Sequence, residues 1–237
     1  QELTNSIWSF LEDTNYRTED GLCPQLCQSI VIVLLQDLIT RLPVDMIPAA
    51  KDFDLFPGEA KNIVLKDILI DLKFRDETLI STGLWLPPGV QGTITFEPTS
   101  PTNPLKPNRQ ITSIESNEGS SNSSSNEREI NDEIDDMIHR SDLTIQVGSH
   151  SQSLLTKPGP WLRWPIVVSV YPVTGTETKI YSPHGGIVYF AVSGLPLEYS
   201  RKVVTLRCHK CCRYPRLIKS KPEVWEKTKD NDIPWGE

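Results

Sequence analysis

Short runs of alternating apolar and polar residues mark the middle and the second half of the chain. Two sets each fall on one face: Leu143, Ile145 and Val147, and Ile187, Tyr189 and Ala191. This period of two is typical of half-buried strands, and the Gly, Pro and Ser clusters between the runs are typical of turns. Further strands are predicted within Asn62–Phe74, Ser81–Gly89, Thr93–Glu97, Ile166–Tyr171, Thr178–Tyr181 and Lys202–Cys208. About eight strands with turns between them predict a mainly β fold, a β-sandwich of the jelly-roll type.

Two details qualify these strands. The alternation slips in phase after Leu65, which indicates a bulge or two short strands in that segment. The Pro87-Pro-Gly89 sequence predicts a tight turn, because proline fixes φ and glycine tolerates positive φ.

A helical period precedes the strands. Between Pro24 and Leu42, apolar residues recur at helical spacing: Leu26, Ile30, Val33, Leu34 and Leu38. Pro24 suits a first helical turn, Arg41 suits the negative end of the helix dipole, and Pro43 ends the helix. The β-branched run Ile30–Val33 leaves a strand as the alternative, but the length favours a buried packing helix.

One segment breaks the apolar pattern. Residues from Thr99 to about Arg140 hold several prolines, a Ser/Asn run and an acidic run, so we expect a disordered insertion between two strands. Within it, helically spaced apolar residues indicate a short helix at Glu129–His139.

These patterns predict three parts. Residues 1–59 form a helical lead-in and linker, 60–210 form the sandwich with its insertion at about 99–140, and 211–237 form a linker toward a further domain. Neither half of the sandwich has enough strands to cover its own apolar face, so both halves should share one core. Its expected members are Leu84, Leu86, Ile145, Val147, Val167, Ile187 and Tyr189.

The net charge of -7 argues against nucleic-acid binding, which needs a basic surface. The five cysteines are Cys23, Cys27, Cys208, Cys211 and Cys212. Cys208 and Cys211 are the candidate metal ligands, because Cys-x-x-Cys can supply two ligands of a tetrahedral zinc site. Two more ligands would have to come from Cys23 and Cys27, so we favour reduced thiols of a cytosolic protein.

Three segments together resemble a known family. They are Ser81-Thr-Gly-Leu-Trp-Leu-Pro-Pro-Gly89, Leu143-Thr-Ile-Gln-Val-Gly-Ser-His150 and Ser182-Pro-His-Gly-Gly-Ile-Val-Tyr-Phe190. Their order is similar to the β domain that precedes the catalytic domain in enhancin-like zinc metallopeptidases, and most of all to TRP-channel-associated factors. Ile233-Pro-Trp-Gly-Glu237 looks like the entrance to the peptidase-like domain, and Ser149 stands where the family commonly has cysteine.

The resemblance implies no catalytic site in this chain. The family binds zinc through His-Glu-x-x-His, whereas none of the four histidines, His139, His150, His184 and His209, is followed by glutamate. We expect His150 and His184 to make hydrogen bonds within turns, and Gly185-Gly186 to allow close packing or a bulge. We expect no cofactor here, and zinc only in a domain beyond Glu237.

The resemblance implies a non-catalytic module that binds a protein partner, such as a membrane channel in channel regulation or trafficking, or the peptidase-like domain. The expected location is cytoplasmic, at the plasma membrane. The alternative is an accessory domain of a secreted zinc metallopeptidase directed at mucins or other glycoproteins. A glycan could then bind to exposed aromatic residues, for which Trp85, Trp161 and Trp164 are the candidates, but we expect at least two of them to pack in the core.

Overall fold

The computed structural model describes residues 17–18, 21–22, 26–43, 46–47, 49–50, 65–75, 78–97, 124–154, 157, 163–200, 202–213, 217–221 and 224–227. Cys23, Trp161, residues 99–123 of the expected insertion and the C-terminal Ile233–Glu237 lie outside these ranges, and the side chain of Cys27 in the first turn of the first helix is not described either. No helix in the described ranges is both long and apolar enough to cross a membrane.

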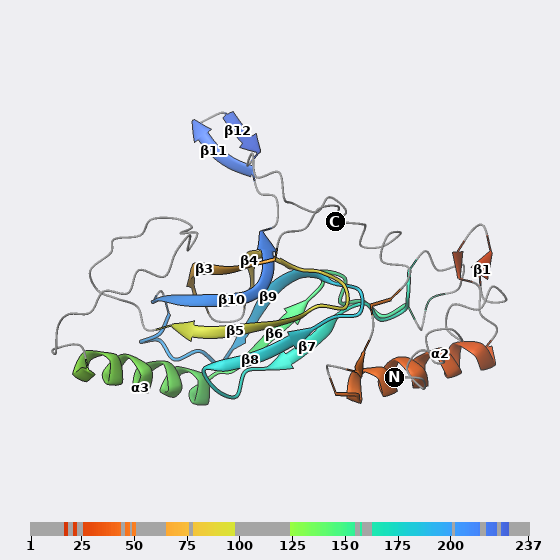
Figure 1. Cartoon of the computed structure of the whole chain (residues 1–237), viewed down its shortest axis with the longest axis horizontal. Helices are drawn as coiled ribbons and strands as arrows, with labels where there is room; N and C mark the ends of the chain where they lie inside the picture. Colours follow the sequence, from red (N-terminus) through yellow and green to blue (C-terminus); the bar gives the residue numbers. More distant parts are fainter. Residues whose placement is uncertain are drawn as a thin grey trace.

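Eight antiparallel strands form the body of the protein (Figure 1). They are β3 (Lys66–Lys73), β4 (Thr78–Leu86), β5 (Gln91–Glu97), β6 (Asp142–Val147), β7 (Ser169–Pro172), β8 (Glu177–Tyr181), β9 (Gly186–Ser193) and β10 (Val203–Arg213). Their order is β7-β6-β9-β4-β10-β5-β8, with β3 on the other side of β10. The mainly β sandwich expected from the alternation is confirmed.

Strand β10 joins the two sheets of the sandwich. Its first part lies between β3 and β5. After a bulge between Cys208 and Cys211, its end pairs with β4 through Cys212 and Arg213. Because β7 also contacts β8, the strand order nearly closes on itself.

Two hairpins and two helices complete the elements of the described chain. The hairpins are β1 (Arg17–Thr18) with β2 (Gly21–Leu22), and β11 (Leu217–Lys221) with β12 (Val224–Lys227). Helix α2 (Leu26–Arg41) confirms the predicted lead-in helix. Arg41 lies in its last turn and forms an ion pair with Asp37, with 2.8 Å between Nε and Oδ2.

One of the two predicted strand details differs in the structure, and the other is as predicted. Leu65 is exposed and precedes β3, so the phase slip marks the start of the strand and not a bulge within it. A bulge occurs instead in β4 between Ser81 and Leu84, where Gly83 has a φ of 70°. The turn after β4 is as predicted, with Gly89 also at a φ of 70°.

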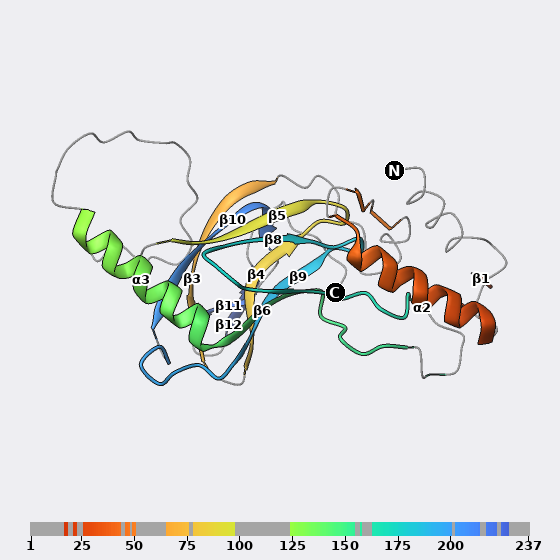
Figure 2. The ribbon, with the colours of Figure 1, turned by 90° about the horizontal axis from the view of Figure 1, so that it is seen from below.

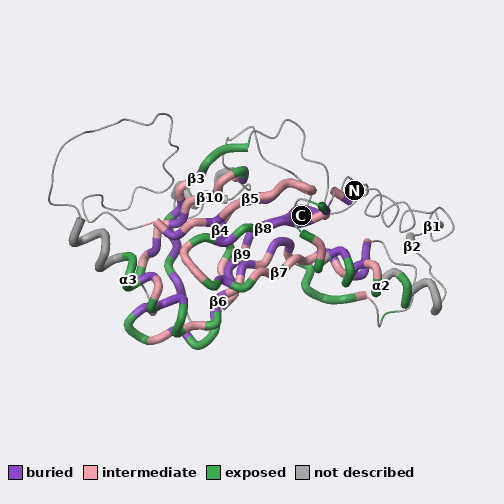
Figure 3. Tube along the Cα trace, turned by 60° about the horizontal axis from the view of Figure 1, so that its bottom comes forward, coloured by how far each residue is buried: buried purple, intermediate pink, exposed green. Residues whose placement is uncertain are grey.

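The main core lies between the sheets. At its centre, Phe190 meets Phe74 and Phe96 edge-on, with ring centroids 5.4 and 6.1 Å apart. Leu84, Leu86, Ile145 and Val147 belong to this core, as predicted. Figure 3 shows the resulting alternation of buried and less buried positions along the strands.

The predicted inward face of β9 is wrong. Val188, Phe190 and Val192 point into the core, whereas Ile187 and Tyr189 pack with Trp85 and Cys212 in a separate cluster. Strand β9 lies between β4 and β6 and has apolar residues on both faces, so alternation alone could not select the inward set. Val167 also leaves the main core and packs beside α2.

Part of the expected insertion is an ordered helix. Helix α3 (Ser124–Arg140) lies at the end of the sandwich opposite α2 (Figure 2). It buries Ile134, Met137 and Ile138 in the main core, so the expectation of disorder as far as Arg140 is wrong for residues 124–140. The three residues share one face, and the sequence spacing had indicated this shorter helix at Glu129–His139.

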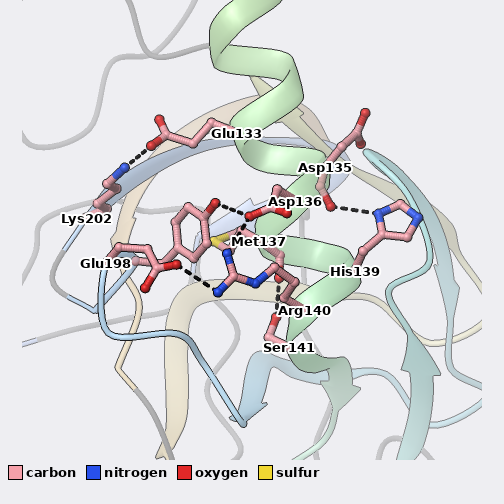
Figure 4. A network of polar contacts seen from close by, with 10 residues as sticks. Glu133, Asp135, Asp136, Met137, His139, Arg140, Ser141, Glu198 and Lys202 are labelled. Atoms are coloured by element: carbon pink, nitrogen blue, oxygen red, sulfur yellow. Dashed lines mark hydrogen bonds and ion pairs between the residues drawn. The ribbon is translucent and has the colours of Figure 1, made fainter.

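Polar contacts attach α3 to the β9–β10 connection (Figure 4). Tyr199 Oη donates to Asp136 Oδ2 at 2.5 Å, and Arg140 forms ion pairs with Asp136 and Glu198 at 3.0 and 2.9 Å. Lys202 pairs with Glu133 one turn earlier. The hydrogen bond from Tyr199, followed by that from Arg140, lowers the pKa of the Asp136 carboxyl.

Candidate functional site

A cavity of about 160 Å³ lies between α2 and the β7–β8 end of the sandwich. Its walls come from four segments that are far apart in the sequence: α2, the residues after it, the segment before and within β7, and the β8–β9 turn. The lining residues are Gln36, Ile39, Leu42, Ile47, Ile166, Val167, Val168, Ser169, Val170, Tyr171, Tyr181, Pro183 and His184. Val170 is 56% exposed, so the cavity reaches the surface at β7.

Hydrogen bonds hold these four segments together. Gln36 Nε2 donates to the carbonyl of Ile166 at 3.0 Å, which fixes α2 to the segment before β7. The amide of Ala50 donates to the carbonyl of Pro183 at 2.8 Å, which fixes the residues after α2 to the β8–β9 turn. Below these contacts Ile39, Ile47 and Val167 pack in one apolar cluster with Trp164 and Tyr181.

Two tyrosine hydroxyls in the cavity wall are used to position backbone. Tyr171 Oη donates to the carbonyl of Tyr181, and Tyr181 Oη donates to the carbonyl of Ile47. Burial raises the pKa of both tyrosines, and the neighbouring Tyr171 raises the pKa of Tyr181 further. Both hydroxyls therefore keep their protons at neutral pH and direct them at protein carbonyls.

His184 is buried in the β8–β9 turn at the edge of the cavity. Its backbone amide donates to Ser182 Oγ at 3.3 Å, which agrees with the predicted hydrogen bonding within the turn. Burial, and then the positive charge of Arg163, lower the pKa of His184 to about 4. The imidazole is therefore neutral at pH 7.

The backbone conformation and the close packing of Gly185 explain why glycine follows His184 in the sequence. Gly185 has a φ of 68°, and an added Cβ would lie 2.7 Å from the carbonyl oxygen of Leu86 and from Pro88. Close packing of the two turns therefore requires glycine here, as predicted from the sequence.

Gln36 supplies a buried acceptor to the cavity. The residue is 7% exposed, and its Oε1 has no hydrogen-bond partner in the described part of the chain. The orientation of the amide is set by its other end, because only Nε2 can donate to the Ile166 carbonyl. A buried oxygen without a partner costs about 1–3 kcal/mol, so it indicates a place for a donor.

The candidate metal ligands lie elsewhere. Cys208 and Cys211 form a disulfide across the bulge of β10, so the expectation of reduced thiols is wrong for this pair. Zinc binds the thiolate form of cysteine, which a disulfide does not provide. The described residues contain no group of three or more His, Cys, Asp or Glu side chains that could hold a metal ion.

The other histidines also lie apart from the cavity lining. His209 Nδ1 is 2.9 Å from Asp67 Oδ2, between β10 and β3. His139 Nδ1 is 2.7 Å from the carbonyl of Asp135 in α3, and His150 is exposed after β6. The structure thus brings only His184 among the four histidines to this site.

Two of the three candidate tryptophans, Trp85 and Trp164, are not exposed. Trp85 is 2% exposed and Trp164 is 3% exposed, and both pack in apolar clusters. The core packing expected for at least two of the three tryptophans is thus confirmed for Trp85 and Trp164, which offer no exposed ring to a glycan, whereas Trp161 lies outside the described residues.

Sequence reasoning missed the cavity. Gln36 stood on a helix predicted to pack, and Tyr181 ended a predicted strand, with no motif joining them. The only signal was a glutamine within an apolar helix, next to residues predicted to be buried.

The architecture defines a class of β-sandwich module with a helix at each end and no histidine-pair metal motif in its sequence. A sequence profile described as the N-terminal domain of M60-like peptidases matches residues 65–205. The chain belongs to this family of N-terminal domains.

The enhancin-like peptidase resemblance is thus supported at the level of the family, while a match to channel-associated factors is not shown. Comparison with curated proteins gives no match.

Three solved structures are also similar. The IMPa metallopeptidase from Pseudomonas aeruginosa has 11% identity and a TM-score of 0.41, over 90% of this chain and 23% of that chain. IMPa in complex with an O-glycopeptide has 12% identity and a TM-score of 0.36, with the same coverage. A functionally unknown conserved protein from Bacillus anthracis has 13% identity and a TM-score of 0.32, over 65% of this chain and 24% of that chain. The chain thus spans about a quarter of the length of these structures, and scores this low leave the family assignment to the profile match.

Proposed function

We propose that this chain is the non-catalytic accessory module of a secreted M60-like zinc metallopeptidase. The family match over residues 65–205 carries this proposal, because the family consists of domains that precede a peptidase domain. The sequence supports a non-catalytic role, since it has no His-Glu pair from which a His-Glu-x-x-His motif could begin. Zinc then belongs to the peptidase domain of the parent protein.

The exposed face of α2 supplies the surface for that domain. Ile30, Leu34 and Leu38 recur at intervals of four residues and are 52%, 63% and 41% exposed, while Gln36 and Ile39 on the opposite face are buried. Exposed apolar groups that are contiguous mark interaction surfaces. In this proposal the face packs against the peptidase domain of the same polypeptide.

The disulfide supports the secreted location. A bond between Cys208 and Cys211 persists in oxidising compartments and is rare in the cytosol. This favours the secreted alternative over the cytoplasmic location expected at first. Channel regulation has no such support, because the matched family is one of peptidases.

The gene sequence beyond Glu237 is the first test. We expect it to encode a peptidase domain with an intact His-Glu-x-x-His motif. A degenerate motif would favour a regulatory protein, and a reading frame without any peptidase-like domain would refute the proposal.

Association with that domain is the second test. The full chain and the separately expressed peptidase domain should bind each other in sedimentation-velocity experiments. Replacing both Leu34 and Leu38 by glutamate should weaken binding at least about 10-fold, because charges would enter an apolar interface. The matched control is Leu197→Glu, since Leu197 is 86% exposed in the β9–β10 connection beside α3. Equal loss of binding in the control would remove the role assigned to α2.

Activity on glycoproteins is the third test. The pure chain should not cleave a mucin, with or without added zinc, whereas the parent protein should cleave it in a chelator-sensitive manner. The glycan partner stays a proposal, and a pull-down on mucin with and without its O-glycans measures it.

A further inference from the structure

We propose that the cavity beside α2 binds an uncharged, ring-sized group that carries one hydrogen-bond donor, such as a phenol. This inference is independent of the proposed function, because it rests on the size, the lining and the unsatisfied acceptor of the cavity.

The size of the cavity sets the size of the group. Its volume of about 160 Å³ is close to that of an apolar protein cavity of about 150 Å³ that binds benzene. Most of its wall is aliphatic, from Ile39, Leu42, Ile47, Ile166, Val167, Val168 and Val170. A single ring fills this space, and the opening at Val170 lets it enter.

The polar groups in the cavity wall favour a ligand that donates a hydrogen bond. The hydroxyls of Tyr171 and Tyr181 already donate their protons to the carbonyls of Tyr181 and Ile47, so they can only accept from a ligand. Gln36 Oε1 is an acceptor without a partner in the described residues, on a side chain that is 7% exposed. A ligand hydroxyl can satisfy this oxygen, whereas a ligand that can only accept leaves it without a partner.

The lining of the cavity disfavours ligands that are charged or that carry many polar groups. None of the described lining residues is Asp, Glu, Lys or Arg, and His184 is neutral at pH 7. A charged ligand would therefore lose its hydration without an opposite charge. A monosaccharide has several hydroxyls, most of which would face aliphatic side chains, so this cavity is not a sugar site.

Ligand binding to the full chain tests the proposal. Phenol, toluene, benzoate, N-acetylgalactosamine and N-acetyltyrosine amide are each titrated and followed by isothermal calorimetry and by protein NMR shifts. Phenol should bind roughly 3- to 10-fold more tightly than toluene, which is the contribution of one neutral hydrogen bond. Binding of N-acetyltyrosine amide would identify a protein side chain as the source of the ring, and binding of phenol alone would identify a free small molecule.

Two variants test whether phenol and toluene bind in this cavity and whether Gln36 causes the preference for phenol. Gln36→Leu removes the acceptor at nearly constant size, so it should abolish the preference for phenol over toluene while toluene still binds. Val168→Trp should fill the cavity and abolish binding of both. Far-UV circular dichroism and thermal unfolding check that each variant is folded.

Several results would overturn the proposal. They are equal affinity of phenol and toluene for the wild-type chain, preferred binding of benzoate or the sugar, an unchanged phenol preference in Gln36→Leu, or NMR shifts that lie away from α2 and β7. Absence of any binding at millimolar concentrations would overturn it as well.

Discussion

At the scale of single residues, the buried His184 makes the stability of the fold depend on pH. Its folded-state pKa of about 4 lies below its ordinary value of 6.5, because of burial and then the charge of Arg163. The unfolded chain therefore binds a proton between these values that the folded chain does not. The contribution of the neutral His184 to the free energy of unfolding is fully present above pH 6.5. It is lost as the pH drops toward 4, by an amount on the order of 3 kcal/mol.

Urea unfolding at several values between pH 7 and pH 4.5 measures this loss. His184→Gln should show a flatter dependence of unfolding free energy on pH, because the variant has no imidazole to protonate at this position. His150→Gln is the control, since His150 is exposed after β6. If the wild type and His184→Gln have the same slope, carboxyl groups and not His184 cause the dependence.

Adjacent residues of β9 should differ sharply in their effect on stability. Phe190 is fully buried between Phe74 and Phe96, so Phe190→Ala should lower the free energy of unfolding by about 3–5 kcal/mol. Tyr189 is half-buried on the opposite face, and Tyr189→Ala should cost less than half of that. Equal losses in chemical denaturation would contradict the observed inward face.

The candidate site shows the limit of sequence reasoning at this scale. Gln36 and Ile166 are 130 residues apart, and Tyr181 and Ile47 are 134 apart, yet each pair is joined by a hydrogen bond. Local periodicity places each residue on an element, but it contains no information on which distant elements meet. The turn at Gly185 was predictable, because positive φ and close approach are properties of glycine itself.

At the scale of elements, α3 should dock through its apolar face and not through its ion pairs. Met137 is 2% exposed, so Met137→Ala should lower stability by about 2–4 kcal/mol. Arg140→Ala should change it little, because the pairs of Arg140 with Asp136 and Glu198 are half-exposed and screened by water. Hydrogen exchange of the α3 amides measures both effects, and a larger loss for Arg140→Ala would reverse the ranking.

Elements differed in how far the sequence predicted them. Helix α2 and strands β6 and β8 were expected close to their observed bounds, because their apolar spacing is regular. Strand β7 was expected over Ile166–Tyr171 but covers Ser169–Pro172. The apolar residues before it pack against α2 instead of a neighbouring strand, and a sequence pattern cannot distinguish these two kinds of burial.

At the scale of the whole molecule, the two halves of the sandwich are joined into one unit. Strands β4 and β5 precede the polar segment, and β6 to β10 follow it, yet β4 pairs with β9 and β5 pairs with β8 and β10. Ile145 lies at the centre with 0% exposure. Unfolding should therefore occur in one cooperative transition.

Two variants in which a linker replaces part or all of the polar segment test whether the sandwich unfolds as one unit. A short Gly/Ser linker in place of residues 99–123 should leave one transition near the wild-type midpoint, because loop-closure cost changes slowly with length. A linker in place of 99–140 also removes Ile134, Met137 and Ile138, so it should lower the midpoint strongly while the transition stays single. Ile145→Asp should unfold both halves together, because a charge in that core has no partner. Differential scanning calorimetry follows all three, and two separate transitions in any of them would show that the halves fold independently.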